Sequence, residues 1–149
     1  MTSNRFHIVI IAVLFLVIAP ATGLGYEIPL ETEPDTVTVK VLGTNTDSRF
    51  EPQVVRVKPG DIIRFEVEEG MHTVTAYHPD NRRELQIPEN AESFDSGILT
   101  AGDTWLLTIT RPGEYNYFCM PHERMGHVGT IISDKSFQIN EHPFLTNKY

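Results

Sequence analysis

One short segment of the sequence concentrates side chains that can bind a metal. Cys119, His122, Met125 and His127 fall within nine residues. This combination suits a metal that accepts both thiolate and imidazole ligands, namely copper, zinc or iron. A strand that ends at Cys119 and a second strand that begins near Val128 would fold these side chains back towards one point. The segment therefore predicts a mononuclear metal site.

Such a site needs another ligand from elsewhere in the chain, and the best donor is His72. It lies between a predicted turn at 68–70 and the β-branched run 73–75. One Cys with two His and a weaker fourth group is the ligand set of blue-copper proteins, whereas structural zinc usually takes more thiolates. The set therefore favours copper over structural zinc.

The segments that must position these ligands are predicted to be strands. Ten Gly and ten Pro punctuate the 149 residues, and no long apolar pattern has a helical period. Runs that alternate, or that are rich in β-branched and aromatic residues, predict an all-β antiparallel sandwich of seven to eight strands. The segment 78–96 is polar and is expected to be a long loop with at most a short helix. The predicted strands are 36–42, 53–57, 61–67, 73–77, 104–109, 114–118 and 128–132.

The N-terminus resembles a secretory signal peptide. Arg5 precedes an uninterrupted apolar run at 8–19, and Ala19-Pro20-Ala21 resembles an A-x-A cleavage site. Twelve apolar residues are fewer than the roughly 20 that a membrane-spanning helix needs. We expect residues 1–21 to be removed, with an uncleaved anchor to about residue 25 as the alternative. This predicts a periplasmic or other extracytoplasmic protein, at the membrane only if the segment is retained.

Charge excludes one class of function. The chain has a net charge of −8, and removal of residues 1–21 would leave 11 basic and 20 acidic residues, a net charge of −9. A nucleic-acid-binding protein needs the opposite sign. In an oxidising compartment the single Cys119 has no partner within the chain, so it is structural, intermolecular or chemically used.

Several motifs occur in the order found in one protein family. The chain resembles a cupredoxin of the plastocyanin and pseudoazurin kind over about residues 36–133, with 134–149 left as a C-terminal tail. The resemblance implies a Greek-key sandwich that holds one type 1 copper through His72, Cys119 and His122. The motifs are Phe50-Glu51-Pro52, Val57-x-Pro59-Gly60-Asp61, His72-Thr73-Val74, Phe94-Asp95-Ser96-Gly97, Pro112-Gly113-x-Tyr115-x-Tyr117-x-Cys119 and Pro121-His122.

The fourth ligand is where this sequence departs from the family pattern. Members with a plastocyanin-length loop place an axial Met eight residues after the Cys and two before a small residue that opens the last strand. Gly129 fixes that register here, and the position holds His127. Met125 is the alternative, because the short amicyanin-type loop has the spacing from Cys119 to Met125. We favour His127, since the closing strand begins at the longer distance.

The resemblance implies a one-electron carrier that transforms no substrate. Its partners would be redox proteins such as a c-type cytochrome, an oxidase or a reductase, and the acidic side chains could attract a basic partner. Two alternatives remain open. Met71, Met120 and Met125 lie beside the proposed ligands, and such thioethers suit a copper-handling or copper-tolerance protein. A small copper enzyme would instead need an open coordination position.

Overall fold

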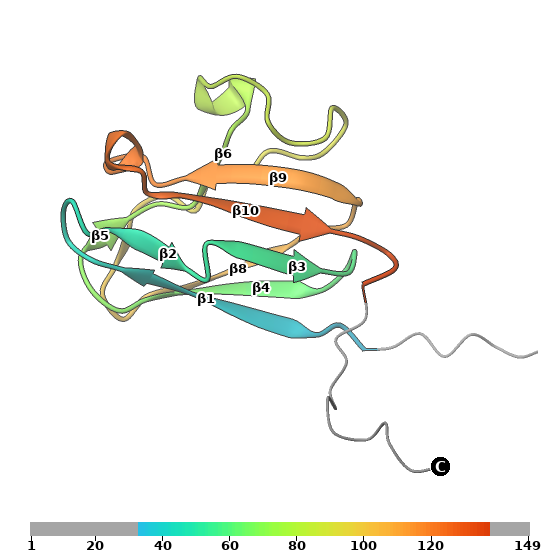
Figure 1. The fold of residues 1–149 in the computed structure, drawn as a ribbon, viewed down its shortest axis with the longest axis horizontal. Coiled ribbons are helices and arrows are strands. Elements are labelled where there is room, and N and C mark those ends of the chain that lie inside the picture. The colour runs from blue at the N-terminus through green and yellow to red at the C-terminus, as the bar shows by residue number, and fades with distance from the viewer. Residues whose placement is uncertain (1–32, 138–149) are drawn as a thin grey trace, which may run out of the picture. The chain divides into compact units, whose positions relative to one another are not determined.

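Two four-stranded sheets form the framework of residues 33–137, which are the residues that this computed structural model describes (Figure 1). The predicted signal peptide, the alternative anchor and residues 138–149 of the predicted tail lie outside them. The first sheet has the order β2-β1-β4-β8, and the second has the order β3-β10-β9-β6. Their strands are β1 (Thr36–Leu42), β2 (Arg49–Glu51), β3 (Val54–Val57), β4 (Ile62–Val67), β6 (Thr75–Ala76), β8 (Thr104–Thr108), β9 (Gly113–Phe118) and β10 (Val128–Ser133).

The all-β sandwich is confirmed, but the number of strands is larger than predicted. Each of the seven predicted runs contains a strand, and three further strands occur among the described residues. These are β2, β5 (Met71–His72) and β7 (Leu99–Thr100), of which β5 and β7 pair with each other. Segments of two or three residues are too short to show an alternating pattern, and so the sequence did not reveal them.

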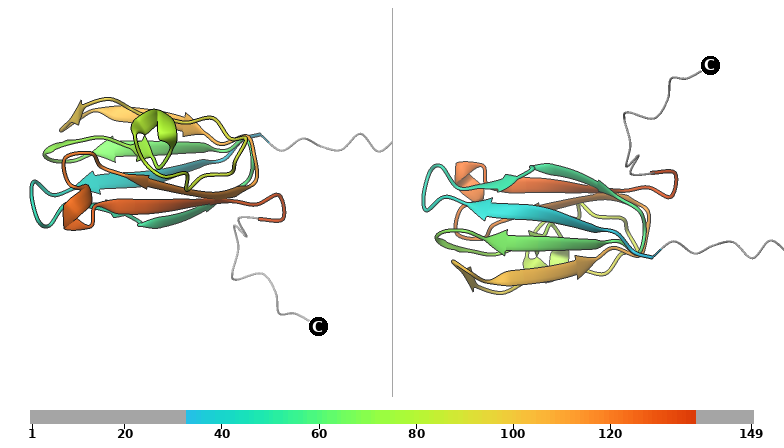
Figure 2. Two further views of the ribbon diagram at one scale, coloured as in Figure 1. Left: turned by 90° about the horizontal axis from the view of Figure 1, so that it is seen from above. Right: turned by 90° about the horizontal axis from the view of Figure 1, so that it is seen from below.

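The prediction that the sandwich is antiparallel was wrong for two strand pairs. β1 lies parallel to β4, with Val39 opposite Phe65, and β3 lies parallel to β10, with Val55 opposite Ile131. The chain crosses between the two sheets, so neighbouring strands need not be joined by a hairpin. Figure 2 shows the two layers from above and from below.

Alternating side chains of the two sheets meet in one core. Along β10 the intermediate and buried positions alternate, so that Gly129, Ile131 and Ser133 face inward. Tyr117 of β9 is fully buried, and its ring packs edge-on against Phe50 and Phe65, with centroids 4.7 and 5.5 Å away. These aromatic contacts join the two layers directly beneath the metal-binding segment.

A close approach in the β9–β10 ladder explains why residue 129 is glycine. Gly129 lies opposite Tyr117, and a Cβ atom on residue 129 would lie 2.3 Å from Cζ of the tyrosine ring. No larger residue fits without moving the ring or the strand. Gly129 therefore sets the register in which β10 begins, one residue after His127.

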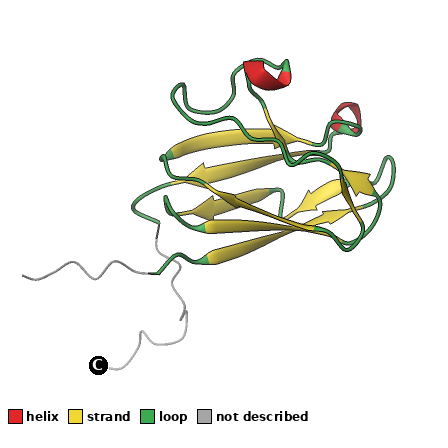
Figure 3. Ribbon diagram, turned by 180° about the vertical axis from the view of Figure 1, so that it is seen from behind, coloured by secondary structure: helices red, strands yellow, loops and turns green. Residues whose placement is uncertain are grey.

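The segment 78–96 leaves the sheet as a long loop, as predicted. It contains one short 3-10 helix, η1 (Pro79–Asn81), and a second, η2 (Glu123–Met125), precedes β10. Figure 3 shows both helices outside the sheets. Among residues 33–137, no helix has the length and apolarity needed to cross a bilayer.

Substitution Gly129→Ala tests the register of this ladder. We expect it to destabilise the protein by roughly 1–3 kcal/mol, because the added methyl overlaps the Tyr117 ring. Urea unfolding followed by circular dichroism measures the change. Thr108→Ala, at an exposed position of β8, is the control and should change stability by less than about 0.5 kcal/mol. Equal stability of Gly129→Ala and the wild type would contradict this packing.

Candidate metal centre

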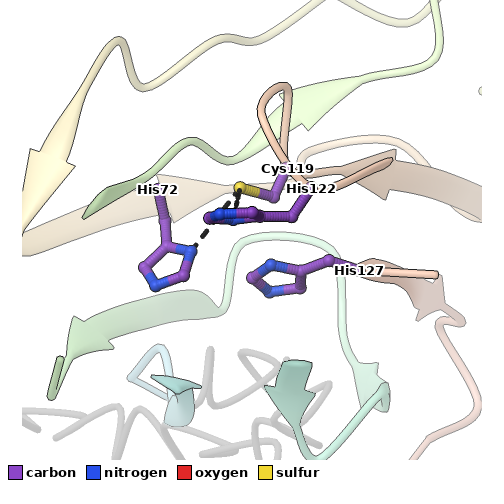
Figure 4. Close-up of side chains that lie close together, drawn as sticks. All are labelled: His72, Cys119, His122 and His127. Atoms are coloured by element: carbon purple, nitrogen blue, oxygen red, sulfur yellow. Dashed lines mark hydrogen bonds between the residues drawn. The ribbon is translucent and has the colours of Figure 1, made fainter. Parts of the chain in front are cut away.

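Four buried side chains meet at one end of the sandwich. His72, Cys119, His122 and His127 each offer one ligand atom, and these atoms all lie within 4.8 Å of one another. Figure 4 shows the four side chains converging from β5 and from the segment between β9 and β10. Ligand bonds of about 2.0–2.3 Å are typical for such donors. The group could therefore hold a single metal ion.

His72 is fixed by hydrogen bonds on the side of its ring that faces away from the cluster. Its Nε2 lies 3.0 Å from the carbonyl oxygen of Gly43 and 2.9 Å from that of Glu69. Because carbonyl oxygens only accept, Nε2 carries the proton, and Nδ1 is left with a free lone pair. That Nδ1 faces Sγ of Cys119 at 3.6 Å. The carbonyls thus select the tautomer that can bind a metal.

The turn before His72 leaves room for its ring only because residue 70 is glycine. Gly70 has a φ of +81°, and a Cβ there would lie 2.6 Å from the Gly43 oxygen and 2.7 Å from Nε2 of His72. Any side chain at this position would disturb the hydrogen bonds that orient the imidazole.

Cys119 follows the end of β9, and its sulfur is fully enclosed. The Thr73 backbone N–H donates to Sγ at 3.4 Å, and Nδ1 of His122 lies 3.4 Å from the same sulfur. Burial raises the pKa of the free thiol, and the Thr73 contact opposes this by favouring the thiolate. Pro121, which has no N–H, cannot add a second backbone donor.

Backbone hydrogen bonds fold the ligand loop, Cys119–His127, into a closed turn. The Cys119 N–H donates to the His127 carbonyl at 3.0 Å, and the His122 N–H donates to the Cys119 carbonyl at 3.0 Å. The Met120 N–H donates to the Thr73 hydroxyl at 2.8 Å, which ties the loop to the segment that carries His72. These bonds bring three of the four ligand atoms together before any metal is bound.

The environment of His127 is the one that best fits a metal-binding histidine. Its ring is fully buried, packs at 4.0 Å from the Phe50 ring, and has no hydrogen-bond partner at Nδ1 or Nε2. Burial, assisted by His72 and His122 and only weakly opposed by the nearby Arg49 backbone, lowers the pKa of His127 to about 3. A buried imidazole without a partner is costly. Both the vacant nitrogens and the neutral ring fit a metal ligand.

Met125 does not share this environment. It ends η2, and its side chain is 42% exposed. His127 precedes β10 at the same parity as the inward-facing Gly129 and Ile131, so its side chain turns into the sandwich. The alternation of the closing strand thus brings His127 into the buried cluster. Met125 lies in η2, before the strand begins, and this alternation does not place it.

The chain belongs to the copper-binding plastocyanin/azurin family. The family described as "Copper binding proteins, plastocyanin/azurin family" matches residues 37–133, which include all four members of the cluster. The resemblance and the expectation of a copper cofactor are confirmed at this level.

Individual relatives agree with the family. The chain is 42% identical over 82 residues to a pseudoazurin from Paracoccus pantotrophus, covering 55% of this chain and 50% of that protein. It is 30% identical over 99 residues to a chloroplastic plastocyanin from Chlamydomonas reinhardtii, covering 64% and 65% respectively. The chain therefore spans half to two thirds of these curated relatives.

Solved structures show the same fold. A pseudoazurin from Sinorhizobium superposes with a TM-score of 0.52 at 31% identity, covering 67% of this chain and 74% of that one. A purple cupredoxin from Nitrosopumilus maritimus gives a TM-score of 0.52 at 17% identity, covering 66% and 99%. The second likeness concerns the fold alone.

The sequence did not reveal the groups that hold the ligands in place. The Gly43 and Glu69 carbonyls and the Thr73 N–H belong to the backbone, and backbone groups leave no residue-type signal. Gly70 gave only a turn signal. Its role beside the His72 ring depends on the approach of Gly43, which lies far away in the sequence.

Substitution His127→Leu tests whether the imidazole lowers the stability of the metal-free protein. We expect the metal-free variant to be more stable than the wild type by about 1–2 kcal/mol, because an unpaired polar ring is replaced by an apolar group. Urea unfolding at pH 8 with a chelator measures this difference. His127→Gln, which keeps a polar group, is the control and should give no such gain. A destabilised Leu variant would show that the ring has a stabilising partner.

Proposed function

We propose that this protein carries single electrons by means of one copper ion held by His72, Cys119, His122 and His127. The observation that supports this most strongly is the convergence of four buried donors, one of which, His127, has no other use for its ring nitrogens. A thiolate with imidazoles is a set that copper accepts well. When bound, copper supplies a couple between Cu(I) and Cu(II).

The enclosure of the site favours a carrier over an enzyme. Catalytic metal sites keep a ligand position open for water or substrate, whereas here four protein side chains surround one point. His72, Cys119 and His127 are fully buried, and His122 is 9% exposed. This arrangement gives no support to the alternative of a small copper enzyme.

The chain's residues would keep the site nearly unchanged between oxidation states. Two carbonyls hold His72, the Thr73 N–H supports the sulfur, and the ligand loop is closed by its own hydrogen bonds. A site that is already formed needs little rearrangement when an electron arrives or leaves. His122 is the least enclosed of the four, and we assign it the exit for the electron.

Beside the site lies an apolar hollow against which a partner could pack. It has a volume of about 340 Å³, and its lining includes Met71, Ile98, Met120 and Pro121. Ile98 and the two methionines have about half or more of their surface exposed. An exposed apolar surface of this kind suits brief contact with a redox protein. We propose a c-type cytochrome, an oxidase or a reductase as the class of partner.

The same thioethers are what a copper-handling protein would use, because they favour Cu(I). The side chains of all four donors, however, are buried, and three of them belong to the ligand loop itself, so release of the metal would require this loop to open. We therefore favour electron transfer. Export to the periplasm or another extracytoplasmic space is proposed from the sequence of residues 1–21.

His127 would make this site differ from one that has a thioether in the fourth position. Imidazole is a stronger donor to Cu(II), and the fourth ligand tunes the potential of such sites. We therefore propose a lowered reduction potential and a green or red colour in place of plain blue.

Substitution Cys119→Ser tests the copper site and its function. The wild type should take up one copper per chain, show an intense thiolate-to-copper absorption band, and be reduced and reoxidised reversibly by an outer-sphere reagent. Cys119→Ser should lose the band while circular dichroism still reports the sandwich, because the ligand is removed and the core is not. Met120→Leu, at the neighbouring exposed residue, is the control and should keep the band. A full band in Cys119→Ser would end the proposal.

Substitution His127→Met tests the fourth ligand. The spectrum should move towards that of a blue site and the potential should rise, because the stronger donor has been replaced. Met125→Leu, in the exposed part of the same loop, should do little. Visible absorption, electron paramagnetic resonance and voltammetry measure these effects. The opposite pattern, with Met125→Leu shifting both quantities and His127→Met neither, would make Met125 the ligand.

A further inference from the structure

One ion pair joins the ligand loop to the long loop 78–96, which we call the excursion. Nε of Arg83 donates to both carboxylate oxygens of Glu123 at 3.1 Å, and Nη2 donates to Oε2 at 2.6 Å. Forked contacts between a guanidinium and a carboxylate fix direction as well as distance. Glu123 directly follows His122, so the pair acts on the residue next to a proposed ligand.

The same guanidinium also touches the other side of the metal-binding segment. Its Cζ lies over the Phe118 ring, 4.9 Å from the centroid, and Phe118 directly precedes Cys119. The Phe118 ring is buried and packs on Tyr77 at 4.6 Å, so it offers a fixed platform. Arg83 therefore contacts both neighbours of the segment from Cys119 to His122.

Hydrogen bonds within the excursion hold Arg83 in place. Its Nη1 donates to the Arg82 carbonyl at 3.1 Å, and its backbone N–H donates to the His78 carbonyl at 3.2 Å. The Asn81 side chain donates to the Ala76 carbonyl at 2.9 Å, which anchors the base of the excursion to β6. The guanidinium thus reaches the ligand loop from a well-supported segment.

We propose that Arg83 is a positioning residue for the metal centre. It holds Glu123 and Phe118 in a fixed relation and thereby sets the place of the His122 ring relative to the Cys119 sulfur. The role at a metal centre rests on the proposed function, that is, on copper binding by the four donors. The contacts through which Arg83 braces the ligand loop require no bound metal.

Hydrogen exchange of the full-length, metal-free protein tests the brace. In Arg83→Gln the amides of His122, Met125 and Gly126, which are hydrogen-bonded within the loop, should exchange about tenfold faster than in the wild type. The Thr130 amide, bonded to the Gln53 carbonyl in the sheet, should keep its rate. Arg82→Gln removes the same charge at the adjacent exposed residue and should change neither.

Two further variants sharpen the result. Glu123→Gln should reproduce the faster loop exchange, and Arg83→Lys should give an intermediate rate, because an ammonium keeps the charge without the fork. In the copper-loaded protein, Arg83→Gln should alter the relative intensities of the charge-transfer bands, whereas Arg82→Gln should not. A merely structural role of Arg83 would leave this spectral signature unchanged.

The outcomes separate the brace from the proposed function. Unchanged loop exchange in Arg83→Gln, or a rise matched by the Thr130 amide, would overturn the role of Arg83, and so would an unaffected loop in Glu123→Gln or an unchanged copper spectrum in Arg83→Gln. Absence of the thiolate band in the wild type would instead defeat the copper proposal and leave the exchange result standing.

Discussion

The antiparallel ladder between β9 and β10 is the constraint on which the rest of the site depends. It pairs Val128 with Phe118 and Gly129 with Tyr117, and the Tyr117 ring fits only because residue 129 has no side chain. With this register set, the connection from Cys119 to His127 has both ends fixed. Three of the four donors are therefore placed by one strand pairing, and the alternation of β10 turns His127 inward.

The same site works against the stability of the metal-free chain. Four polar groups occupy positions in or beside the aromatic core, and burial of polar groups is favourable only when they find partners. His72 finds two carbonyls, the Cys119 sulfur accepts from Thr73, and His127 finds none. A metal bound here would take one of the two vacant His127 nitrogens, so that its binding energy would add to folding stability. In the metal-free chain, the aromatic packing around Tyr117 offsets the cost of burying these polar groups.

Support for the site comes in successive layers from distant parts of the chain. The segment that carries His72 also supplies the Thr73 contacts to the sulfur and to Met120. Outside it, Arg83 joins the excursion to Phe118 and Glu123. Asn81 ties the excursion to β6, which belongs to the same sheet as β9 and β10. Arg83 is therefore attached to the sheet that contains the β9–β10 ladder. The parts that position the ligands thus share one rigid frame.

The sequence by itself singled out His72 as the best distant donor and left Met125 as an alternative to His127. It determined the class of fold, the location of seven strands, and the segment that carries three of the four residues of the cluster. These features are local: alternation needs a few consecutive residues, and three donors lie within nine positions. Only the tertiary structure decided the parallel pairings of β1 with β4 and β3 with β10, the short strands β2, β5 and β7, and the tautomer of His72. It also brought Arg83 to Glu123, 40 residues away. Such contacts depend on how crossing connections bring remote backbone and side chains together, and they therefore leave no local pattern in the chain.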